Sequence, residues 1–365
     1  MLDDDPRDRE PLSTPVDSGP TLSICVPTFR RPELAQRAIR SIIDSVGNRH
    51  LDVEIIVSDN SPELSEGACR EALAAWPGKS LYIGHRPNVG MAANFDTCIA
   101  RASGTYILFV HDDDRLLRNA VPQIVRAVAT PGPSSAVLFF GVHVVDESQR
   151  VIRRQQFCRD ASIGPAGALG RLLTDNGIAW FPGLVVRREA YLAVGPFDPE
   201  SGNATDLDMW VRLFSAHGLR CVPGAISAYS VHLTSATQTT AFDGDAISRI
   251  LAIFARAERI GVQSVAEVRR YRAQFLPQVI LGTAAFAMRA GRRPEAREVM
   301  SLFNLPAVKS LQLSRTWLPV RFVFSVLVRS PSALVRPLLT LLDKLDLVRR
   351  VRAVQTRGES ALPFC

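Results

Sequence analysis

A buried strand that ends in acidic residues constrains this chain more than any other feature. Residues 104–114 are Gly-Thr-Tyr-Ile-Leu-Phe-Val-His-Asp-Asp-Asp, and residues 106–110 have the apolar, β-prone composition of a buried strand. His111 and the carboxylates Asp112, Asp113 and Asp114 follow it directly. Open α/β sheets bind ligands in the crevice beyond the carboxyl ends of their strands. The segment therefore predicts an α/β fold with an acidic site at this edge of the sheet.

Neighbouring carboxylates repel one another, so this cluster needs strong solvation, a cationic neighbour or a divalent cation. Hard oxygen ligands suit Mg²⁺ or Mn²⁺, which proteins commonly share with a substrate phosphate. We therefore expect Mn²⁺ or Mg²⁺ as cofactor. A solvated acidic turn without a ligand is the alternative for this segment.

Strand-like and helix-like segments alternate over most of the chain. Strands are expected at residues 21–26, 51–57, from 81, 106–110, 136–145, 184–186 and 221–232, with amphipathic helices between many of them. This alternation predicts βαβ units and a mainly parallel sheet. From residue 246 the pattern is helical and rich in arginine. We expect an irregular leader at 1–20, an α/β domain at 21–245 and a helical extension at 246–365.

The positive charge of the chain is concentrated in its last part. The formal net charge is +7, and arginines flank apolar blocks such as residues 321–329. No block is long enough to span a membrane, so basic, amphipathic helices on an anionic membrane surface are expected. Packing of these helices on the domain or on a second subunit is the alternative. No nucleic-acid-binding motif is present, so no nucleic-acid partner is expected, and the oligomeric state stays open.

The cysteines and the N-terminus favour a cytoplasmic location. The six cysteines are scattered and form no C-x-x-C pair, as expected for a reducing compartment. The first residues lack the basic and apolar regions of a secretory signal. With the basic tail, this predicts a cytoplasmic protein on the inner face of the plasma membrane.

Four motifs occur in order, each at a strand end or a helix start. They are Pro27-Thr28-Phe29-Arg30, Asp59-Asn60-Ser61, His111-Asp112-Asp113-Asp114 and Asp206-Leu207-Asp208-Met209-Trp210. Together they resemble the inverting family 2 glycosyltransferases of GT-A fold. The resemblance covers residues 21–237 and does not extend to the C-terminal part. It implies a GT-A fold, with a Rossmann-like, mainly parallel sheet flanked by helices, and a nucleotide-sugar donor.

The resemblance implies which residues contact the nucleotide. Pro27, Thr28, Phe29 and Arg30 match a Pro-Thr-Tyr-Asn-Arg motif, here without the asparagine, and Asp59 stands where an aspartate contacts a pyrimidine base. Asn88, Gly90 and Asn94 match a segment beside the diphosphate, and Asp112 and Asp113 complete the nucleotide site. An Asx turn at Asp59, and an ordinary turn and helix start at Asn88–Gly90, are the alternatives.

The acidic cluster resembles the Asp-x-Asp metal motif of the family in two possible alignments. Aligned on the strand, His111 replaces the first aspartate and Asp113 is the second. Aligned on the acids, Asp112 and Asp114 form the pair. We expect Asp113 or Asp114 to bind the metal directly, and His232 to be a metal or diphosphate ligand unless it is structural.

Asp206 is implied as the general base, which takes the proton from the acceptor hydroxyl. Thr205 replaces the glutamate that precedes it in the family. We expect Thr205 or Asp206 to cap the following helix, whose dipole would keep the carboxylate ionised. A capping role alone is the alternative for Asp206. Additional site residues are expected to brace the site or to lie on the acceptor side: Trp180, Gly183, Asp208 and Trp210.

These observations predict a metal-dependent inverting glycosyltransferase that uses a UDP- or dTDP-sugar and a glycan or lipid-linked acceptor, in bacterial surface polysaccharide or glycolipid synthesis. The departures at Asn60, His111 and Thr205 leave a non-catalytic, nucleotide-sugar-binding scaffold of a membrane complex as the alternative. Nucleotidyltransferases and dinucleotide-dependent oxidoreductases are disfavoured, because no glycine-rich phosphate loop follows any strand. The sequence does not specify the sugar, the nucleotide or the acceptor.

Overall fold

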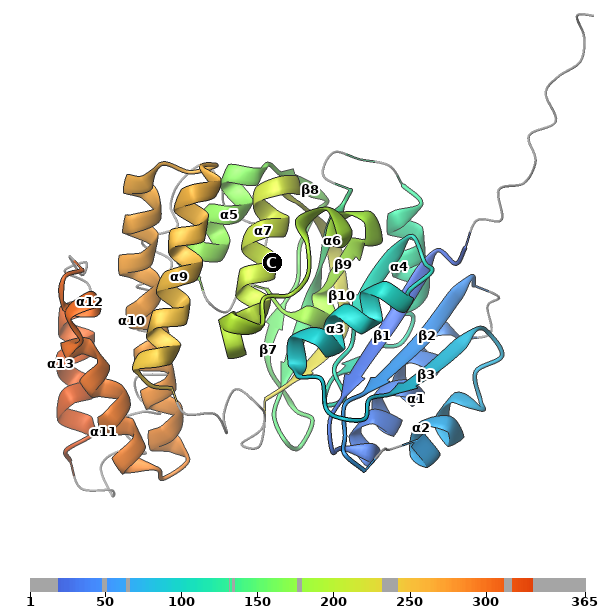
Figure 1. Cartoon of the computed structure of the whole chain (residues 1–365), viewed down its shortest axis with the longest axis horizontal. Helices are drawn as coiled ribbons and strands as arrows, with labels where there is room; N and C mark the ends of the chain where they lie inside the picture. The colour runs from blue at the N-terminus through green and yellow to red at the C-terminus, as the bar shows by residue number, and fades with distance from the viewer. Residues whose placement is uncertain are drawn as a thin grey trace, which may run out of the picture.

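The computed structural model describes residues 19–47, 51–63, 66–130, 132, 135–175, 179–231, 242–311 and 317–330. Over these residues one mixed sheet carries helices on both faces (Figure 1). Its strands are β1 (Leu22–Thr28), β2 (Val53–Asp59), β3 (Ser80–Gly84), β4 (Tyr106–Phe109), β5 (Arg115–Leu116), β6 (Val137–Val145), β7 (Val151–Gln155), β8 (Ala161–Ile163), β9 (Leu184–Arg187) and β10 (Leu219–Ser230).

The helices that cover the sheet are α1 (Pro32–Val46), α2 (Glu66–Leu73), α3 (Met91–Arg101), α4 (Ala120–Val128), α5 (Pro165–Thr174), α6 (Arg188–Val194) and α7 (Thr205–His217). Further along the chain come α9 (Gly244–Ile260), α10 (Val265–Arg289), α11 (Arg293–Ser301), α12 (Pro306–Lys309) and α13 (Trp317–Leu327). Three short 3₁₀ helices complete the described residues: η1 (Phe181–Gly183), η2 (Pro199–Ala204) and η3 (Leu302–Asn304).

The order of the strands places β1 and β4 side by side. The sheet runs β3-β2-β1-β4-β9-β6-β10-β5, with β7 paired to β6 and β8 to β10. β1, β2, β3 and β4 pair in parallel, as do β6 and β10, while β9 is antiparallel to both β4 and β6. Because Cys25 pairs with Phe109, the residues that follow β1 and β4 leave the sheet at the same edge. The predicted α/β fold with a mainly parallel sheet is confirmed.

Side chains that alternate along the strands pack into two hydrophobic cores, one on each face of the sheet. In β1, Cys25 faces a core that includes α3, α5 and α7, whereas Ile24 faces a core that includes α1, α2 and α4. Both side chains are fully buried. Strands that are covered on both faces need nearly continuous apolar sequences, which explains the composition of β1, β2 and β4.

The C-terminal helices share the first of these cores. α9 contacts α7 and η2, and α10 contacts α5, α9 and α11 (Figure 1). Ile250 and Phe254 of α9 are buried in the same cluster as Phe109 of β4. Full burial of such a side chain stabilises a fold by about 1.5–3 kcal/mol. The helical part of the chain is therefore packed tightly against the sheet-bearing part.

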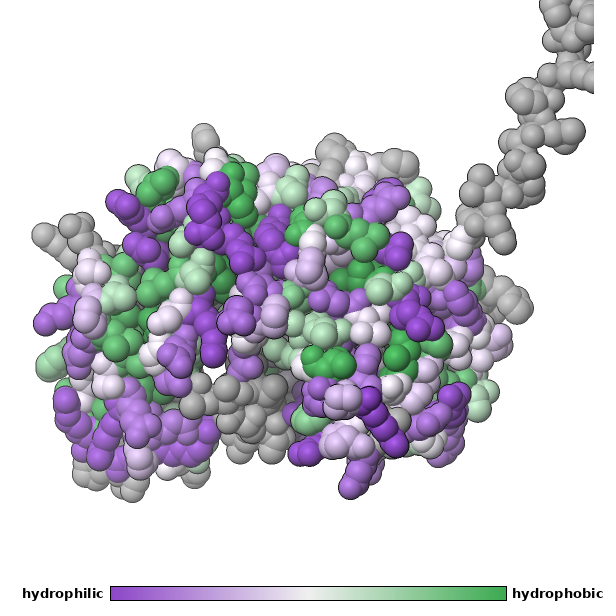
Figure 2. Space-filling model, in the orientation of Figure 1, coloured by the Kyte–Doolittle hydropathy of each residue, from purple (hydrophilic) through white to green (hydrophobic). Residues whose placement is uncertain are grey.

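Helix α13 is apolar on two sides. It buries Trp317 and Phe324 among the C-terminal helices, while Leu318, Phe322 and Val326 are 51%, 70% and 48% exposed. Figure 2 shows apolar surface between polar side chains over the C-terminal helices. In the part of the chain that is described, every helix is too short or too polar to cross a bilayer. The expected membrane contact stays a prediction, and residues 331–365, like the leader at 1–18, lie outside the described residues.

Two features differ from the sequence-based expectation. Residues 146–159, which show no clear pattern, contain β7, an edge strand whose side chains are mostly exposed and therefore need not be apolar. Among the described cysteines, Cys25, Cys69, Cys98 and Cys221 are free and buried, as expected for a reduced chain. Cys158 is instead disulfide-bonded, which that expectation did not include.

Candidate active site

A cavity of about 430 Å³ opens beyond the ends of β1 and β4. This volume lies within the usual range of small-molecule sites. The cavity brings together eight of the residues proposed from the sequence: Pro27, Thr28, Phe29, Asn88, Asn94, Asp112, Asp113 and Asp206. It is also lined by residues that the sequence did not single out as ligands, among them Arg31, Asn203, Tyr229 and Ser230.

Asp112 is held between β1 and the start of α1. Thr28 Oγ1 donates a 2.8 Å hydrogen bond to Asp112 Oδ2, and Arg31 Nη1 lies 3.3 Å from Asp112 Oδ1. Arg31 Nη1 also lies 3.0 Å from Asp113 Oδ2. Burial, and then the neighbouring Asp113, raise the pKa of Asp112 to about 6. Arg31 is thus the cationic neighbour that such an acidic cluster requires.

His111, Asp113 and Asp114 form a cluster of potential metal ligands. One ligand atom from each lies within 4.8 Å of the others. Asp114 Oδ1 accepts a 3.1 Å hydrogen bond from Ser230 N, whereas Asp114 Oδ2 and His111 Nε2 are buried without a hydrogen-bond partner among the described residues. Leaving buried polar atoms unpaired costs free energy, and a bound cation would remove that cost. The cluster therefore fits Mn²⁺ or Mg²⁺.

Aromatic packing fixes the ring of His111 in this cluster. The ring stacks on Phe95, with centroids 5.6 Å apart and planes 5° apart, and lies 4.7 Å from Phe181. Burial lowers the pKa of His111, which favours the neutral imidazole that a metal ligand must be. The sequence left His111 without a role. His232, the histidine proposed as a ligand, lies outside the described residues.

Asp206 lines the cavity in the first turn of α7. Its Oδ1 accepts a 2.6 Å hydrogen bond from Leu207 N. The N-cap of α7 is Ala204, and Thr205 Oγ1 instead donates to the carbonyl oxygen of Asp198 at 3.0 Å, so the predicted cap at Thr205 or Asp206 was wrong by one or two residues. The helix dipole was expected to keep this carboxylate ionised, and a carboxyl group with a pKa of about 6 is mostly ionised at neutral pH. Burial outweighs the backbone amides and raises the pKa of Asp206 to about 6.

Tyr229 lines the cavity close to the acidic cluster. Burial, and the charges of Asp114, Asp113 and Asp206, raise the pKa of its phenol. Its ring lies 4.2 Å from that of Trp180, whose Nε1 donates a 3.0 Å hydrogen bond to Gln155 Oε1. Trp180 therefore stands behind Tyr229 and does not itself line the cavity. Its proposed acceptor contact stays a prediction.

Asparagines form the wall beside α3. Asn60 Nδ2 donates to Asn88 Oδ1 at 2.9 Å and to the carbonyl oxygen of Gly90 at 3.1 Å. Gly90 has φ 88°, a conformation that favours glycine, and it is the N-cap of α3. Ser58 Oγ donates to Asn94 Oδ1 at 2.6 Å. The departure from the family pattern at Asn60 thus supplies a cross-link between two loops of the cavity.

Three proposed nucleotide-binding residues, Gly90, Asp59 and Arg30, do not line the cavity. Asp59 is fully buried, and it accepts hydrogen bonds from Ser61 N at 2.9 Å and from the Tyr82 hydroxyl at 2.8 Å. The bond from Ser61 is the Asx turn that was the alternative for this residue. Arg30 is exposed, and its backbone N–H donates to Ser61 Oγ at 2.7 Å. Contact of any of these three residues with a nucleotide stays a prediction.

The remaining proposed site residues are buried away from the cavity. A Cβ at Gly183 would lie 2.7 Å from Val142 Cγ2, so packing against β6 requires glycine there. Trp210 packs edge-on against Phe181 at 5.4 Å and belongs to the hydrophobic core. Asp208 is 1% exposed and forms ion pairs with two arginines, which are described below.

Comparison with known proteins identifies relatives of this chain. An uncharacterized protein of Mycobacterium tuberculosis is 28% identical over 64% of this chain and 74% of its own length. A GalNAc(5)-diNAcBac-PP-undecaprenol beta-1,3-glucosyltransferase of Campylobacter jejuni is 32% identical, over only 29% of this chain and 34% of its own length. This chain therefore spans about a third of that characterised relative.

Among solved structures, TarS of Staphylococcus aureus has a similar fold. The structure of its residues 1–349 in complex with UDP-GlcNAc superposes with a TM-score of 0.58 at 12% identity, covering 84% of this chain and 87% of that one. A longer TarS chain is covered to 53%. At this identity the likeness concerns the fold.

Residues 23–194 match the family described as Glycosyl transferase family 2. The match contains the strand ends of β1 and β4 and the acidic cluster, but ends before Asp206. The sequence motifs, the GT-A-like fold and these comparisons agree. Residues 23–194 therefore form a domain of the glycosyl transferase family 2 type.

Proposed function

We propose that the protein is a metal-dependent inverting glycosyltransferase that transfers a sugar from a UDP- or dTDP-sugar to a hydroxyl group of a glycan or lipid-linked acceptor. One observation carries the proposal. Asp206, a carboxylate with its pKa raised to about 6, lines the same cavity as Asp112 and Asp113. A general base works best when its pKa lies near the working pH.

The donor would lie along the wall formed by Pro27, Thr28, Phe29, Asn60 and Asn88. These residues present backbone groups, an aromatic ring and amides, which together suit a nucleoside. The UDP-GlcNAc complex of TarS, which has a similar fold, supports a nucleotide-sugar donor. The diphosphate would then lie toward Arg31 and the acidic cluster, where Arg31 can donate hydrogen bonds to it.

His111, Asp113 and Asp114 would hold Mn²⁺ or Mg²⁺. When bound, such an ion supplies positive charge that stabilises the departing nucleoside diphosphate. The unpartnered atoms His111 Nε2 and Asp114 Oδ2 support this assignment.

Asp206 would act on the acceptor. Its carboxylate takes the proton of the acceptor hydroxyl while that oxygen attacks the anomeric carbon and the bond from this carbon to the diphosphate oxygen breaks. Attack from the face opposite the leaving group inverts the anomeric configuration. The enzyme needs no covalent intermediate, and Asp206 ends the step protonated.

A relative's acceptor and the surface of α13 support the acceptor side of the proposal. The Campylobacter relative is named for an undecaprenol-diphosphate-linked acceptor, which supports a role in bacterial cell-surface polysaccharide or glycolipid synthesis. Leu318, Phe322 and Val326 form an exposed apolar stripe on α13 that suits an anionic membrane. We propose a cytoplasmic protein at the inner face of the plasma membrane, with an irregular leader at 1–20, a catalytic domain at 21–245 and a membrane-facing helical part at 246–365.

Calorimetric titration with nucleoside diphosphates, with Mn²⁺ or with a chelator, tests the donor site. We expect UDP or dTDP to bind only with the metal, and not to bind Asp113→Ala/Asp114→Ala. Asp206→Asn should bind the nucleotide normally but lose transfer, whereas Asp44→Asn, at an exposed position of α1, should retain both. Metal-independent binding would refute the metal site. Normal cellular function of Asp206→Asn would favour the non-catalytic scaffold.

A further inference from the structure

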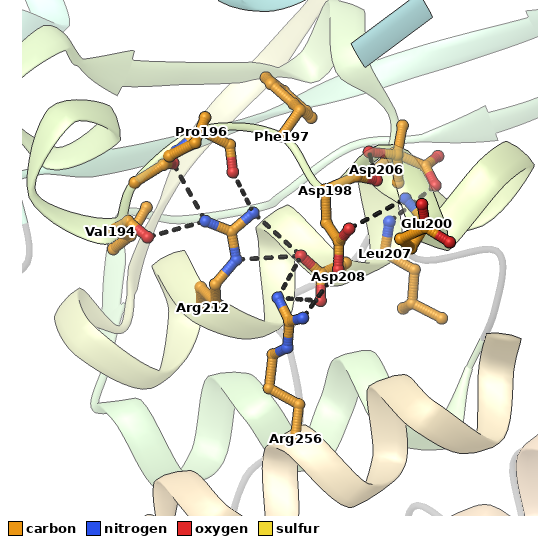
Figure 3. A network of polar contacts seen from close by, with 12 residues as sticks. Val194, Pro196, Phe197, Asp198, Glu200, Asp206, Leu207, Asp208, Arg212 and Arg256 are labelled. Carbon is orange, nitrogen blue, oxygen red and sulfur yellow. Dashed lines mark hydrogen bonds and ion pairs between the residues drawn. The ribbon is translucent and has the colours of Figure 1, made fainter.

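The guanidinium group of Arg256, on α9, joins two carboxylates that flank the segment bearing Asp206. Its Nη2 lies 2.7 Å from Asp198 Oδ2, and its Nη1 lies 2.9 Å from Asp208 Oδ1 (Figure 3). We propose that Arg256 is a positioning residue, which holds the segment 198–208 so that Asp206 faces the cavity. This inference rests on the proposed function, because it concerns the placement of the proposed general base.

Asp198 and Asp208 determine the shape of this segment from its two ends. Asp198 Oδ1 accepts a 3.0 Å hydrogen bond from Glu200 N at the start of η2, and its carbonyl oxygen accepts one from Thr205 Oγ1 at 3.0 Å. Asp208 lies in the first turn of α7, two residues after Asp206. Between the two acids, Asn203, Thr205 and Asp206 all line the cavity. A shift of either end would therefore move the cavity wall.

Two arginines pair with Asp208: Arg212 lies on the same helix, α7, whereas Arg256 lies on α9. Arg212 pairs with Asp208 at 2.9 Å, but its other hydrogen bonds go to the backbone carbonyls of Val194, Gly195 and Pro196 (Figure 3). Arg212 thus links α7 to the residues that directly precede the segment 198–208. Arg256 links that segment to α9, and so to the other C-terminal helices.

The charges make this connection specific. The side chain of Asp208 is 1% exposed, and a buried carboxylate is tolerated only when it is paired. Burial raises the pKa of Asp208, Arg212 and Arg256 lower it, and repulsion by Asp198 adds a smaller increase. One planar guanidinium can bridge two carboxylates through separate N–H groups, which an ammonium group does less well. Without Arg256, the like charges of Asp198 and Asp208 would repel each other, and the two ends of the segment 198–208 would move apart.

Helix α9 does not depend on Arg256 to stay in place. Ile247, Ile250, Ile253, Phe254 and Ala257 are all buried against the core. Substitution of Arg256 should therefore leave the helix packed and alter the segment that it holds. Arg259, an exposed arginine on the same helix, pairs with no acid in the described part of the chain and offers a matched control.

Kinetics of Arg256→Met, Arg256→Lys and Arg259→Met test the inference. We expect Arg256→Met to lower kcat roughly 10- to 100-fold, the usual effect of a small misplacement of a catalytic group. KM for the donor and the affinity for the nucleoside diphosphate should not change, because Arg256 does not line the cavity. Arg256→Lys should recover part of kcat, and Arg259→Met should match the wild-type protein.

Hydrogen exchange of backbone amides supplies a readout that needs no turnover. In Arg256→Met, exchange should accelerate in residues 198–208 and stay unchanged in β1 and β4. Unchanged kcat or unchanged exchange in this segment would overturn the inference, as would parallel losses of kcat, nucleotide affinity and thermal stability. Absence of transfer by the wild-type protein would instead refute the proposed function, and this inference with it.

Discussion

Thr28, the last residue of β1, donates a 2.8 Å hydrogen bond from Oγ1 to Oδ2 of Asp112, which follows β4. The two residues are far apart in the chain, and the parallel register of β1 and β4 brings them together. Both are buried. The bond ties the proposed nucleotide wall to the acidic cluster, so each of these parts depends on the other.

Thr28→Val should destabilise the protein by about 1–3 kcal/mol, because it leaves a buried carboxylate without one of its donors while it preserves the shape of the side chain. Chemical denaturation measures this change in the free energy of unfolding. Thr97→Val is the control, since Thr97 Oγ1 donates only to the carbonyl oxygen of Ala93 within α3. Equal effects of the two substitutions would contradict the role given to the bond from Thr28.

The pH dependence of kcat should report Asp206. Its pKa of about 6 predicts that kcat falls as the pH decreases through 6, because the base becomes protonated. Asp206→Asn should lower kcat by roughly 10²- to 10⁴-fold and remove this acidic limb. A limb that persists in the residual activity of Asp206→Asn would assign the titration to another group.

Asp206→Asn should stabilise the fold above pH 6. The pKa of Asp206 is raised in the folded protein, so the folded state binds more protons than the unfolded state between about pH 4 and pH 6. The wild-type protein therefore loses stability as the pH rises through this window. Melting temperatures should show Asp206→Asn above wild type at pH 8, with a difference that shrinks toward pH 4. A constant difference would contradict this linkage.

His111→Phe should weaken Mn²⁺ binding without loss of packing. Phenylalanine can keep the stacking on Phe95 but lacks the unpartnered Nε2. We expect a 10- to 100-fold loss of metal affinity by calorimetry, with the nucleoside diphosphate present. His217→Phe, at another histidine whose Nε2 has no hydrogen-bond partner among the described residues, should bind the metal normally. Unchanged affinity in His111→Phe would exclude His111 as a ligand.

Arg31→Met should change metal and nucleotide binding in opposite directions. Arg31 Nη1 lies 3.0 Å from Asp113 Oδ2, so its charge competes with a cation at the cluster, yet it attracts a diphosphate. Mn²⁺ alone should bind more tightly to the variant, and UDP more weakly. Arg37→Met is the control, because Arg37 is exposed on α1 and does not line the cavity. Parallel changes in both affinities would show that Arg31 acts by some other means.

Features encoded by local sequence were predictable. The apolar run before His111 and the strand–helix alternation depend on neighbouring residues, so the position of the acidic cluster at a strand end followed from the sequence. The edge strand β7 was missed, because exposed strands carry no apolar pattern. Arg31 follows directly after a recognised motif, and only the need of the acids for a cation pointed to it.

Features that depend on long-range packing were not predictable. The pKa of Asp206 is raised by its burial in the folded chain, which a sequence motif at a helix start does not reveal. Tyr229 reaches the cavity near the end of β10, which pairs with β6 through two register shifts around Ala225. Arg256 meets Asp208 across 48 positions of sequence. None of these relations leaves a local signature.

The core that α9 and α10 share with the sheet has a consequence for stability. Phe254 and Phe275 pack against each other, with centroids 5.4 Å apart, inside the cluster that also contains Phe109. Because the two parts share one core, the burial that stabilises the C-terminal helices also stabilises the sheet. A substitution in the C-terminal helices therefore also changes the stability of the sheet that carries the site. Sequence change in these helices is limited by that shared core.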